Sequence, residues 1–234
     1  MKKRIIILVF VLILASILRL YKIGEVPYDQ AADYIDTIGH YTEVKWLYDN
    51  IFVKHNFNFH NLVHYNLAGV KTDFYFSLPF YIILHNNLSL HVTSFIFEIL
   101  TIVFLYLFTK EFLDEKTALI ASFLYAILPS AIEWHRYVLE HSKFSFFAVF
   151  SLFLFYRWNK TKQKKYLFFT ASTMGFALSV HMSFIFFICS FLTFITIEKL
   201  LSKNMKFNSR DVNYFLTGFT IGALLLIINT ILFF

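Results

Sequence analysis

Long apolar runs constrain this chain more than any other feature of its sequence. Hydrophobic residues make up 58% of its 234 residues and charged residues only 15%, whereas a soluble domain has about half and a quarter. Seven runs approach the roughly 20 apolar residues that a helix needs to cross a bilayer. The sequence therefore predicts an all-α polytopic membrane protein with about seven transmembrane helices. The predicted spans are residues 4–22, 89–109, 117–134, 142–158, 166–181, 183–200 and 212–234.

The distribution of Lys and Arg predicts the orientation, because cytoplasmic loops carry an excess of basic residues. Most of the 21 basic residues lie at the N-terminus and in the loops at 110–116, 157–165 and 199–210. Seven remain for the other side: Arg19, Lys22, Lys45, Lys54, Lys71, Arg136 and Lys143. We therefore expect the plasma (inner) membrane and a cytoplasmic N-terminus. The net charge of +6 is then a topology signal, and no nucleic-acid partner is expected.

The first outer loop, about residues 23–88, is the only large hydrophilic element, so chemistry outside the cytoplasm is expected there. Residues 73–85 within it are apolar but short for a crossing, and we interpret them as an interfacial or re-entrant helix. Residues 29–52 have the pattern of an amphipathic helix that lies on the membrane. Asp29 is its predicted N-cap.

No linker or repeat divides the chain, so residues 1–234 are expected to form a single module. Its only cysteine, Cys189, excludes an intrachain disulfide and argues against a Cys-based metal site. The last span ends at Phe234 without a polar tail. Two expectations stay open here, a complete module and the N-terminal part of a longer protein.

An acidic cluster follows the first span directly, where ionisable groups are costly and need a functional or pairing reason. Asp29, Asp33, Asp36, His40 and Glu43 recur every three or four residues, which places them on one stripe of the predicted helix. One interpretation is a solvated helix face, with its first acids favoured by the helix dipole. The other is an acid/base site or a divalent-cation site, because clustered carboxylates raise one another's pKa and a cation lowers it. Asp36 and His40, four residues apart, could share a metal.

Ionisable residues also crowd the short loop between the third and fourth spans. Arg136 lies one turn from Glu140, so an intrahelical ion pair is one interpretation. The other is that the guanidinium binds an anionic lipid phosphate at the membrane surface. His181 falls at the outward tip of the fifth and sixth spans, where it is either exposed to water or lines the same cavity.

Four segments resemble a known family in the same order along the chain. The run from Leu18 to Asp29 (LRLYKIGEVPYD) resembles the start of membrane glycosyltransferases with the C-type fold. The closest group is the superfamily of dolichyl-phosphate-mannose protein mannosyltransferases and aminoarabinose lipid A transferases. Residues 71–84, 107–112 and 128–140 resemble three later segments of that group. The chain departs from the pattern at Gln30, where the family has Glu, and at Thr72-Asp73, where it has paired prolines.

This resemblance implies transfer of a sugar from a polyprenyl-phosphate-linked donor to a lipid or protein acceptor outside the cytoplasm, with inversion at the anomeric carbon. Asp29 would be the base that takes the acceptor proton, and Asp36 a second catalytic candidate. The residues expected to bind substrate are Arg136, Glu140, Lys143, Asp33 and His181. The cations among them would stabilise the donor phosphate. No resident cofactor is expected with certainty, and a divalent cation stays open.

Two other functions are compatible with the sequence. The first is a catalytically inactive protein that binds a lipid-linked sugar, or a subunit of a larger membrane complex, and Gln30 favours it. The second is a transporter or flippase. Transporters typically carry midplane charges and paired repeats, and neither is evident in this sequence.

Overall fold

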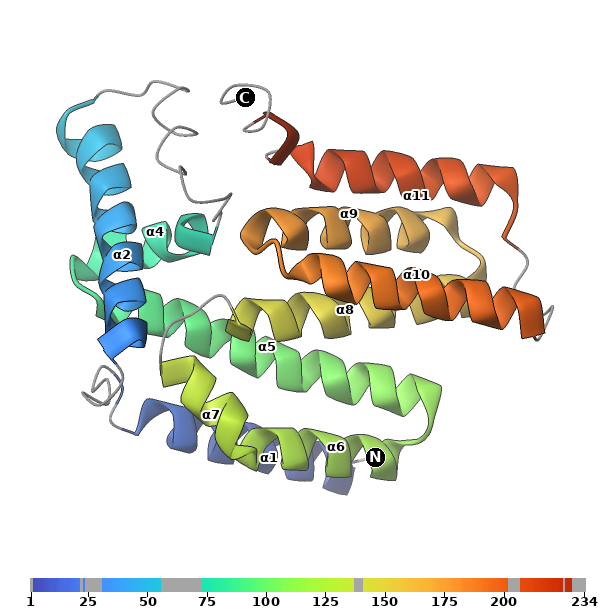
Figure 1. Ribbon diagram of the computed structural model, residues 1–234. Helices are drawn as coiled ribbons and strands as arrows, with labels where there is room; N and C mark the ends of the chain where they lie inside the picture. The colour runs from blue at the N-terminus through green and yellow to red at the C-terminus, as the bar shows by residue number, and fades with distance from the viewer. Residues whose placement is uncertain are drawn as a thin grey trace. The chain divides into compact units, whose positions relative to one another are not determined.

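All regular secondary structure in the described part of the chain is helical (Figure 1). The computed structural model describes residues 2–21, 23, 31–55, 73–136, 141–201, 207–224 and 226–228. The helices are α1 (Lys2–Leu20), α2 (Ala31–Tyr48), the π-helical turn η1 (Asp49–Val53), α4 (Asp73–Leu84), α5 (Leu88–Phe112), α6 (Glu115–Ile127), α7 (Pro129–Arg136), α8 (His141–Thr161), α9 (Lys164–Val180), α10 (Phe184–Leu201) and α11 (Ser209–Gly222). Within these residues one helix, α5, is long and apolar enough to cross a membrane. It agrees with the predicted span at 89–109. The predicted span at 117–134 is interrupted at Leu128, and the other five spans stay predictions.

The chain divides into two compact units. The first comprises residues 1–67 and 72–146, and the second comprises residues 68–71 and 147–234. The division falls inside α8, whose residues 141–146 belong to the first unit.

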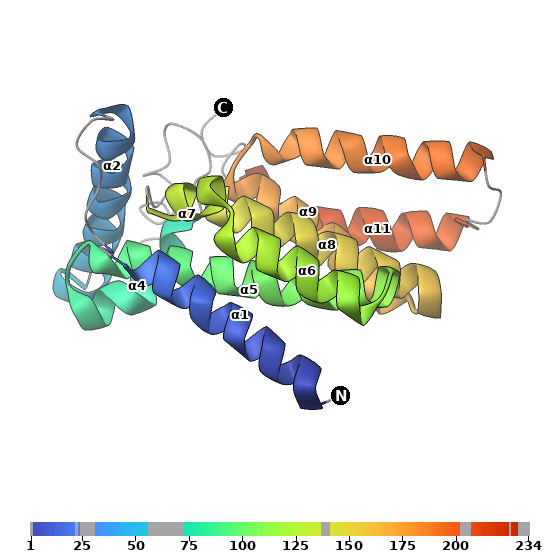
Figure 2. The same cartoon turned by 90° about the horizontal axis from the view of Figure 1, so that it is seen from below.

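Three helices form the centre of the first unit. α1 packs against both α5 and α6 (Figure 2). Small and branched side chains let these helices approach closely, and the buried core between them consists of Val11, Ala15, Ile102 and Ala126. This packing fixes the C-terminal end of α1, after which the chain continues toward α2.

A clasp of polar groups joins the N-terminal end of α1 to the turn between α5 and α6. The Arg4 guanidinium donates to the carboxylate of Glu115, the first residue of α6, over 2.5 Å. Tyr106 and Lys110, in the last turns of α5, donate to the other carboxylate oxygen over 3.1 and 3.3 Å. α1 is therefore held at both ends.

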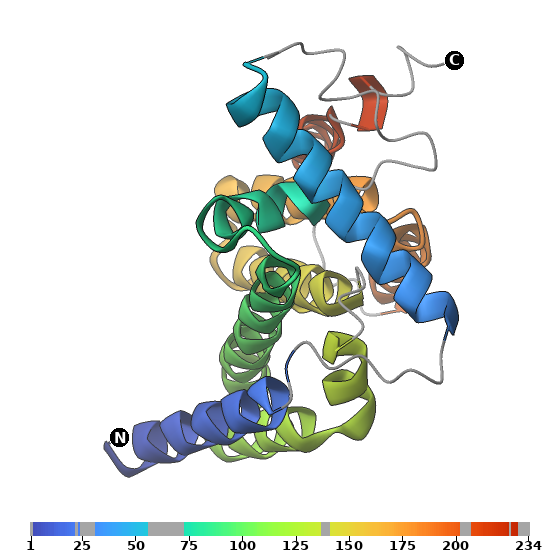
Figure 3. The same cartoon turned by 90° about the vertical axis from the view of Figure 1, so that its left-hand side faces the viewer.

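Two helices of the predicted outer loop form a second core on the first unit. α2 crosses α4, and α4 packs on the start of α5 (Figure 3). Val44, Leu47, Tyr81 and Leu90 are buried between these helices. The helical patterns at 29–52 and 73–85 are confirmed for the described residues, whereas the predicted N-cap, Asp29, lies outside them.

The predicted span at 117–134 is wrong as one continuous helix. α6 ends at Ile127, and Leu128 has the extended backbone (ψ 118°) that a following proline favours. Pro129 then begins α7, where its fixed φ and missing N–H are tolerated. The short helix α7 packs against α1, α5 and α6.

The second unit is organised by close packing of α9 and α11. Gly218 and Gly222 are spaced as in a G-x-x-x-G motif, which lets helix backbones approach. A Cβ at either residue would overlap a backbone carbonyl of α9, that of Phe168 or Ser172. The Ser172 hydroxyl in turn donates to the Gly218 carbonyl over 3.0 Å.

Candidate functional site

A buried ion pair joins α1 and α5 in the first unit. The Arg19 guanidinium donates to the Glu98 carboxylate over 3.1 Å, and both side chains are almost completely buried. Arg19 also donates to the backbone carbonyl of Ala126, in the last turn of α6, over 2.9 Å. One guanidinium therefore links the C-terminal ends of α1 and α6 to the middle of α5. When one partner of such a pair is removed, the folded protein loses about 3–5 kcal/mol of stability.

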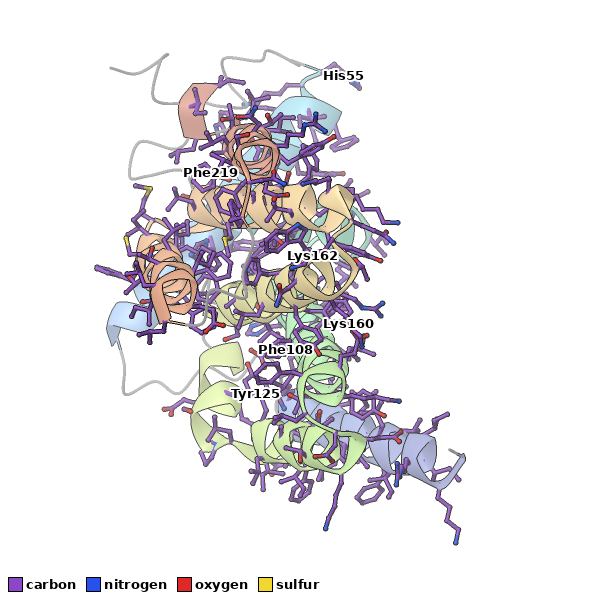
Figure 4. The ribbon with its side chains drawn as sticks, turned by 90° about the vertical axis from the view of Figure 1, so that its right-hand side faces the viewer. His55, Phe108, Tyr125, Lys160, Lys162 and Phe219 are labelled. Carbon is purple, nitrogen blue, oxygen red and sulfur yellow. The ribbon has the colours of Figure 1, made fainter. Side chains whose placement is uncertain are left out.

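Tyr125 extends this network. Its hydroxyl lies 3.4 Å from the second Glu98 carboxylate oxygen and donates to it, and it also hydrogen-bonds with Ser145 in the first turn of α8. Four helices of the first unit thus contribute to one polar network, labelled in Figure 4 at Tyr125. We call Arg19, Glu98, Tyr125 and Ser145 the buried polar network.

A stripe of polar residues continues along α5 from Glu98 toward its N-terminal end. Ser94 and His91 lie four and seven residues before Glu98, so all three share one helix face. Both side chains are buried, and neither has a hydrogen-bond partner among the described residues. Buried polar groups are normally satisfied by protein or ordered water, so this stripe marks the polar side of α5.

Aromatic rings brace α2 against α4. Tyr48 and Tyr81 lie 5.4 Å apart, and His85 lies 5.1 Å from Tyr48, in edge-to-face arrangements. Burial raises the pKa of Tyr75 to about 12. Burial also raises the pKa of Tyr81, and a hydrogen bond with Tyr41 adds to this effect. These phenols stay neutral at physiological pH, and the contacts hold α2 in a fixed position on α4.

The stripe of α2 is not simply a solvated face. His40 is 2% exposed, and its Nδ1 lies 3.9 Å from the Glu43 carboxylate. Val44 and Leu47, which are buried against α4 and α5, lie four and seven residues after His40 and therefore share its helix face. The interpretation of this stripe as solvated is wrong at His40, because the face that carries it is the one that packs inward.

The predicted site residues fall at different places. Asp33 and Asp36 lie on α2, and Arg136 is the last residue of α7. Lys143, in the first turn of α8, is fully buried. These four residues belong to the first unit, whereas His181 is the C-cap of α9 in the second unit, where its Nδ1 accepts from the Ser183 N–H. Asp29 and Glu140 lie outside the described residues.

A metal site is not supported by the side chains that the structure describes. Among them, no three His, Cys, Asp or Glu residues are grouped closely enough to hold an ion. The predicted pair of Asp36 and His40 is not tested, because the Asp36 side chain is outside that set.

Sequence reasoning missed the partners of Arg19. Glu98 is the only acidic residue between Leu88 and Lys110, and a lone carboxylate inside an apolar span is a functional or pairing signal. The expectation that no midplane charge is evident was therefore wrong at Glu98, which lies near the middle of the predicted span at 89–109. The Ala126 carbonyl has no sequence signal, because every residue carries one.

In the residues that the structure describes, the fold is all-helical, one helix is long and apolar enough to cross a membrane, and a buried charged network joins the ends of α1 and α6 to the middle of α5. Comparison with known proteins identifies the class. A family model described as dolichyl-phosphate-mannose-protein mannosyltransferase matches residues 72–231, which is more than half of the chain. The chain belongs to this family, which confirms the resemblance seen in the sequence and indicates a membrane-associated glycosyltransferase. No curated protein and no solved structure matches it.

Proposed function

We propose that the chain transfers a sugar from a polyprenyl-phosphate-linked donor to a lipid or protein acceptor outside the cytoplasm. Membership of the dolichyl-phosphate-mannose-protein mannosyltransferase family carries this proposal. The match begins at residue 72, so the role of the acidic cluster at 27–36 rests on the resemblance of that segment and on its chemistry.

The arrangement of the first unit supports a site shared by two segments. Arg19 holds the ends of α1 and α6 together. Asp29 follows α1 in the sequence and lies two residues before α2 begins. α7 follows α6, and its last residue is Arg136. Both segments therefore start close together, at the ends of α1 and α6 that Arg19 joins. α2 itself packs against α4 and α5.

The proposed reaction is a single displacement. The Asp29 carboxylate takes the proton from the acceptor hydroxyl or amine as that group attacks the anomeric carbon. The bond from the anomeric carbon to the phosphate oxygen breaks, and the polyprenyl phosphate leaves with the electron pair. Arg136 stabilises the charge on the leaving phosphate. Attack from the face opposite the phosphate inverts the configuration.

Secondary roles follow from position. Asp33 and Asp36, one and two helical turns beyond Asp29, orient the acceptor or a cation. Lys143 is fully buried, so its charge acts on the phosphate through the protein and not by direct contact. Gln30 in place of Glu favours the alternative function, a protein that binds a lipid-linked sugar without turnover.

A genetic experiment tests the proposal without knowledge of the sugar. Lipids and proteins of cells with and without the chain are compared by mass spectrometry for a glycosylated species that disappears on deletion. The wild-type chain should restore that species, whereas Asp29→Asn should not, at equal amounts in the membrane. Asp49→Asn is the matched control, because Asp49 pairs with Lys45 on the surface of α2 and η1. Restoration by Asp29→Asn would remove the assigned base. If no glycosylated species is lost on deletion while the protein still binds the donor, the alternative of binding without turnover fits instead.

A further inference from the structure

The turn between α8 and α9 in the second unit concentrates positive charge. Residues 157–165 carry five basic side chains and no acidic one. Lys164 is neutralised by an ion pair with Asp211 of α11. Lys160, Lys162 and Lys165 are exposed and have no acidic partner among the described residues. We call these three lysines the cationic patch, and Figure 4 labels two of them, Lys160 and Lys162, at this end of α8 and α9.

Each lysine of the patch lies over an aromatic ring. The Nζ atoms of Lys160, Lys162 and Lys165 lie 6.0, 5.0 and 5.2 Å from ring centroids. The rings belong to Tyr156, Trp158 and Tyr166. Tyr and Trp are enriched where a membrane protein meets the interface, and lysines there extend their charges to the headgroups. The patch therefore has the layered order of a membrane surface, with rings beneath and ammonium groups above.

Trp158 adds a second observation that points to a ligand. Its indole ring is 1% exposed and packs against Phe155 and Phe207, with both centroids 5.2 Å away. The indole Nε1 is buried and has no acceptor among the described residues. Buried indole N–H groups usually find a partner, so this N–H is a donor left for an oxygen from outside the described residues.

We propose that the cationic patch binds the headgroups of anionic phospholipids in the leaflet that it faces. Clusters of Lys and Arg next to membrane helices attract anionic lipids, with about a five-fold gain for each lysine near the surface. The patch lies at the turn between α8 and α9, which overlap two predicted membrane spans. This position, with Tyr and Trp rings beneath the lysines, favours a lipid over a nucleic acid or a soluble anion. This inference is independent of the proposed glycosyl transfer.

Quenching of Trp158 fluorescence tests the proposal on the full chain. Trp46→Phe and Trp134→Phe leave Trp158 as the one tryptophan, and the protein is placed in vesicles of phosphatidylcholine. Brominated phosphatidylglycerol or brominated phosphatidylcholine is then added at the same mole fraction. The anionic lipid should quench at a mole fraction at least ten-fold lower than the neutral lipid. The preference should shrink in high salt, because exposed charges are screened.

Substitution of the patch identifies its source. Lys160→Gln, Lys162→Gln and Lys165→Gln together should remove the preference. The control replaces three other exposed lysines, Lys3, Lys54 and Lys116, and should keep it, although it loses the same charge. Equal quenching by the two lipids in the parent protein, or an unchanged preference in the patch variant, would overturn the proposal. So would full competition by millimolar inorganic phosphate, which would assign the patch to a soluble anion.

Discussion

Removal of one member of the Arg19–Glu98 pair should destabilise the protein far more than removal of both. Arg19→Met leaves the Glu98 carboxylate buried without its cation, and Glu98→Met leaves the guanidinium with the Ala126 carbonyl. Each loss of a buried partner costs about 3–5 kcal/mol. The double variant leaves neither charge behind, and Met has a volume close to that of the side chains replaced. Its stability should lie within about 2 kcal/mol of the wild type, since buried pairs are often neutral against apolar replacements.

The measurement is a double-mutant cycle on the free energy of unfolding of the full chain in a mild detergent. The coupling energy is the deviation of the double variant from the sum of the single variants, and we expect about 4 kcal/mol or more. The control cycle uses Lys45→Met and Asp49→Met, an exposed pair four residues apart, for which about 0.3–0.5 kcal/mol is expected. A buried-pair coupling below about 1 kcal/mol, or a double variant as unstable as the sum, would refute the reasoning.

Two further predictions concern other contacts. The hydrogen bond from Arg4 is the main cause that lowers the pKa of Glu115 from 4.5 to about 2. Because the folded-state pKa is the lower one, the Glu115 carboxylate stabilises the fold above about pH 4.5, and this stabilisation is lost as the pH falls toward 2. Glu115→Gln should flatten the dependence of the melting temperature on pH in this range, and an unchanged profile would contradict the clasp. Gly222→Ala places a methyl group against the Ser172 carbonyl and should lower the free energy of unfolding by about 1–3 kcal/mol. The control, Gly39→Ala, has open space around it and should raise the free energy of unfolding by about 0.5–1 kcal/mol. Equal effects of the two variants would exclude close packing as the cause.

Most of the helices could be predicted from the sequence, because apolar runs and their periodicity are local signals. The break at Leu128-Pro129 also had a local signal, since a proline disfavours helix at the residue before it, although the prediction of one span at 117–134 did not use it. The stripe at Asp33, Asp36 and His40 predicted which residues share a face. Whether that face packs inward depends on α4, which the spacing within α2 does not reveal.

The buried polar network was harder to predict. Glu98 could have been identified as the lone acid in an apolar run, but its partner Arg19 lies 79 residues away in the sequence. The bond from Arg19 to the Ala126 carbonyl spans 107 residues and depends on how three helices pack. Sequence spacing within one helix carries no information on such a contact. The roles of Asp29 and Glu140 stay predictions, because both residues lie outside the described part of the chain.

The central claim is that the carboxylate of Asp29 acts as the base in glycosyl transfer from a polyprenyl phosphate. Its most direct measurement is the release of polyprenyl phosphate from a lipid-linked sugar by the purified chain in the presence of acceptor, compared with binding of the same donor. The wild type should release the lipid phosphate. Asp29→Asn should bind the donor with unchanged affinity and release it at least a hundred-fold more slowly. Equal release by both proteins, or donor binding without release by the wild type, would contradict the account.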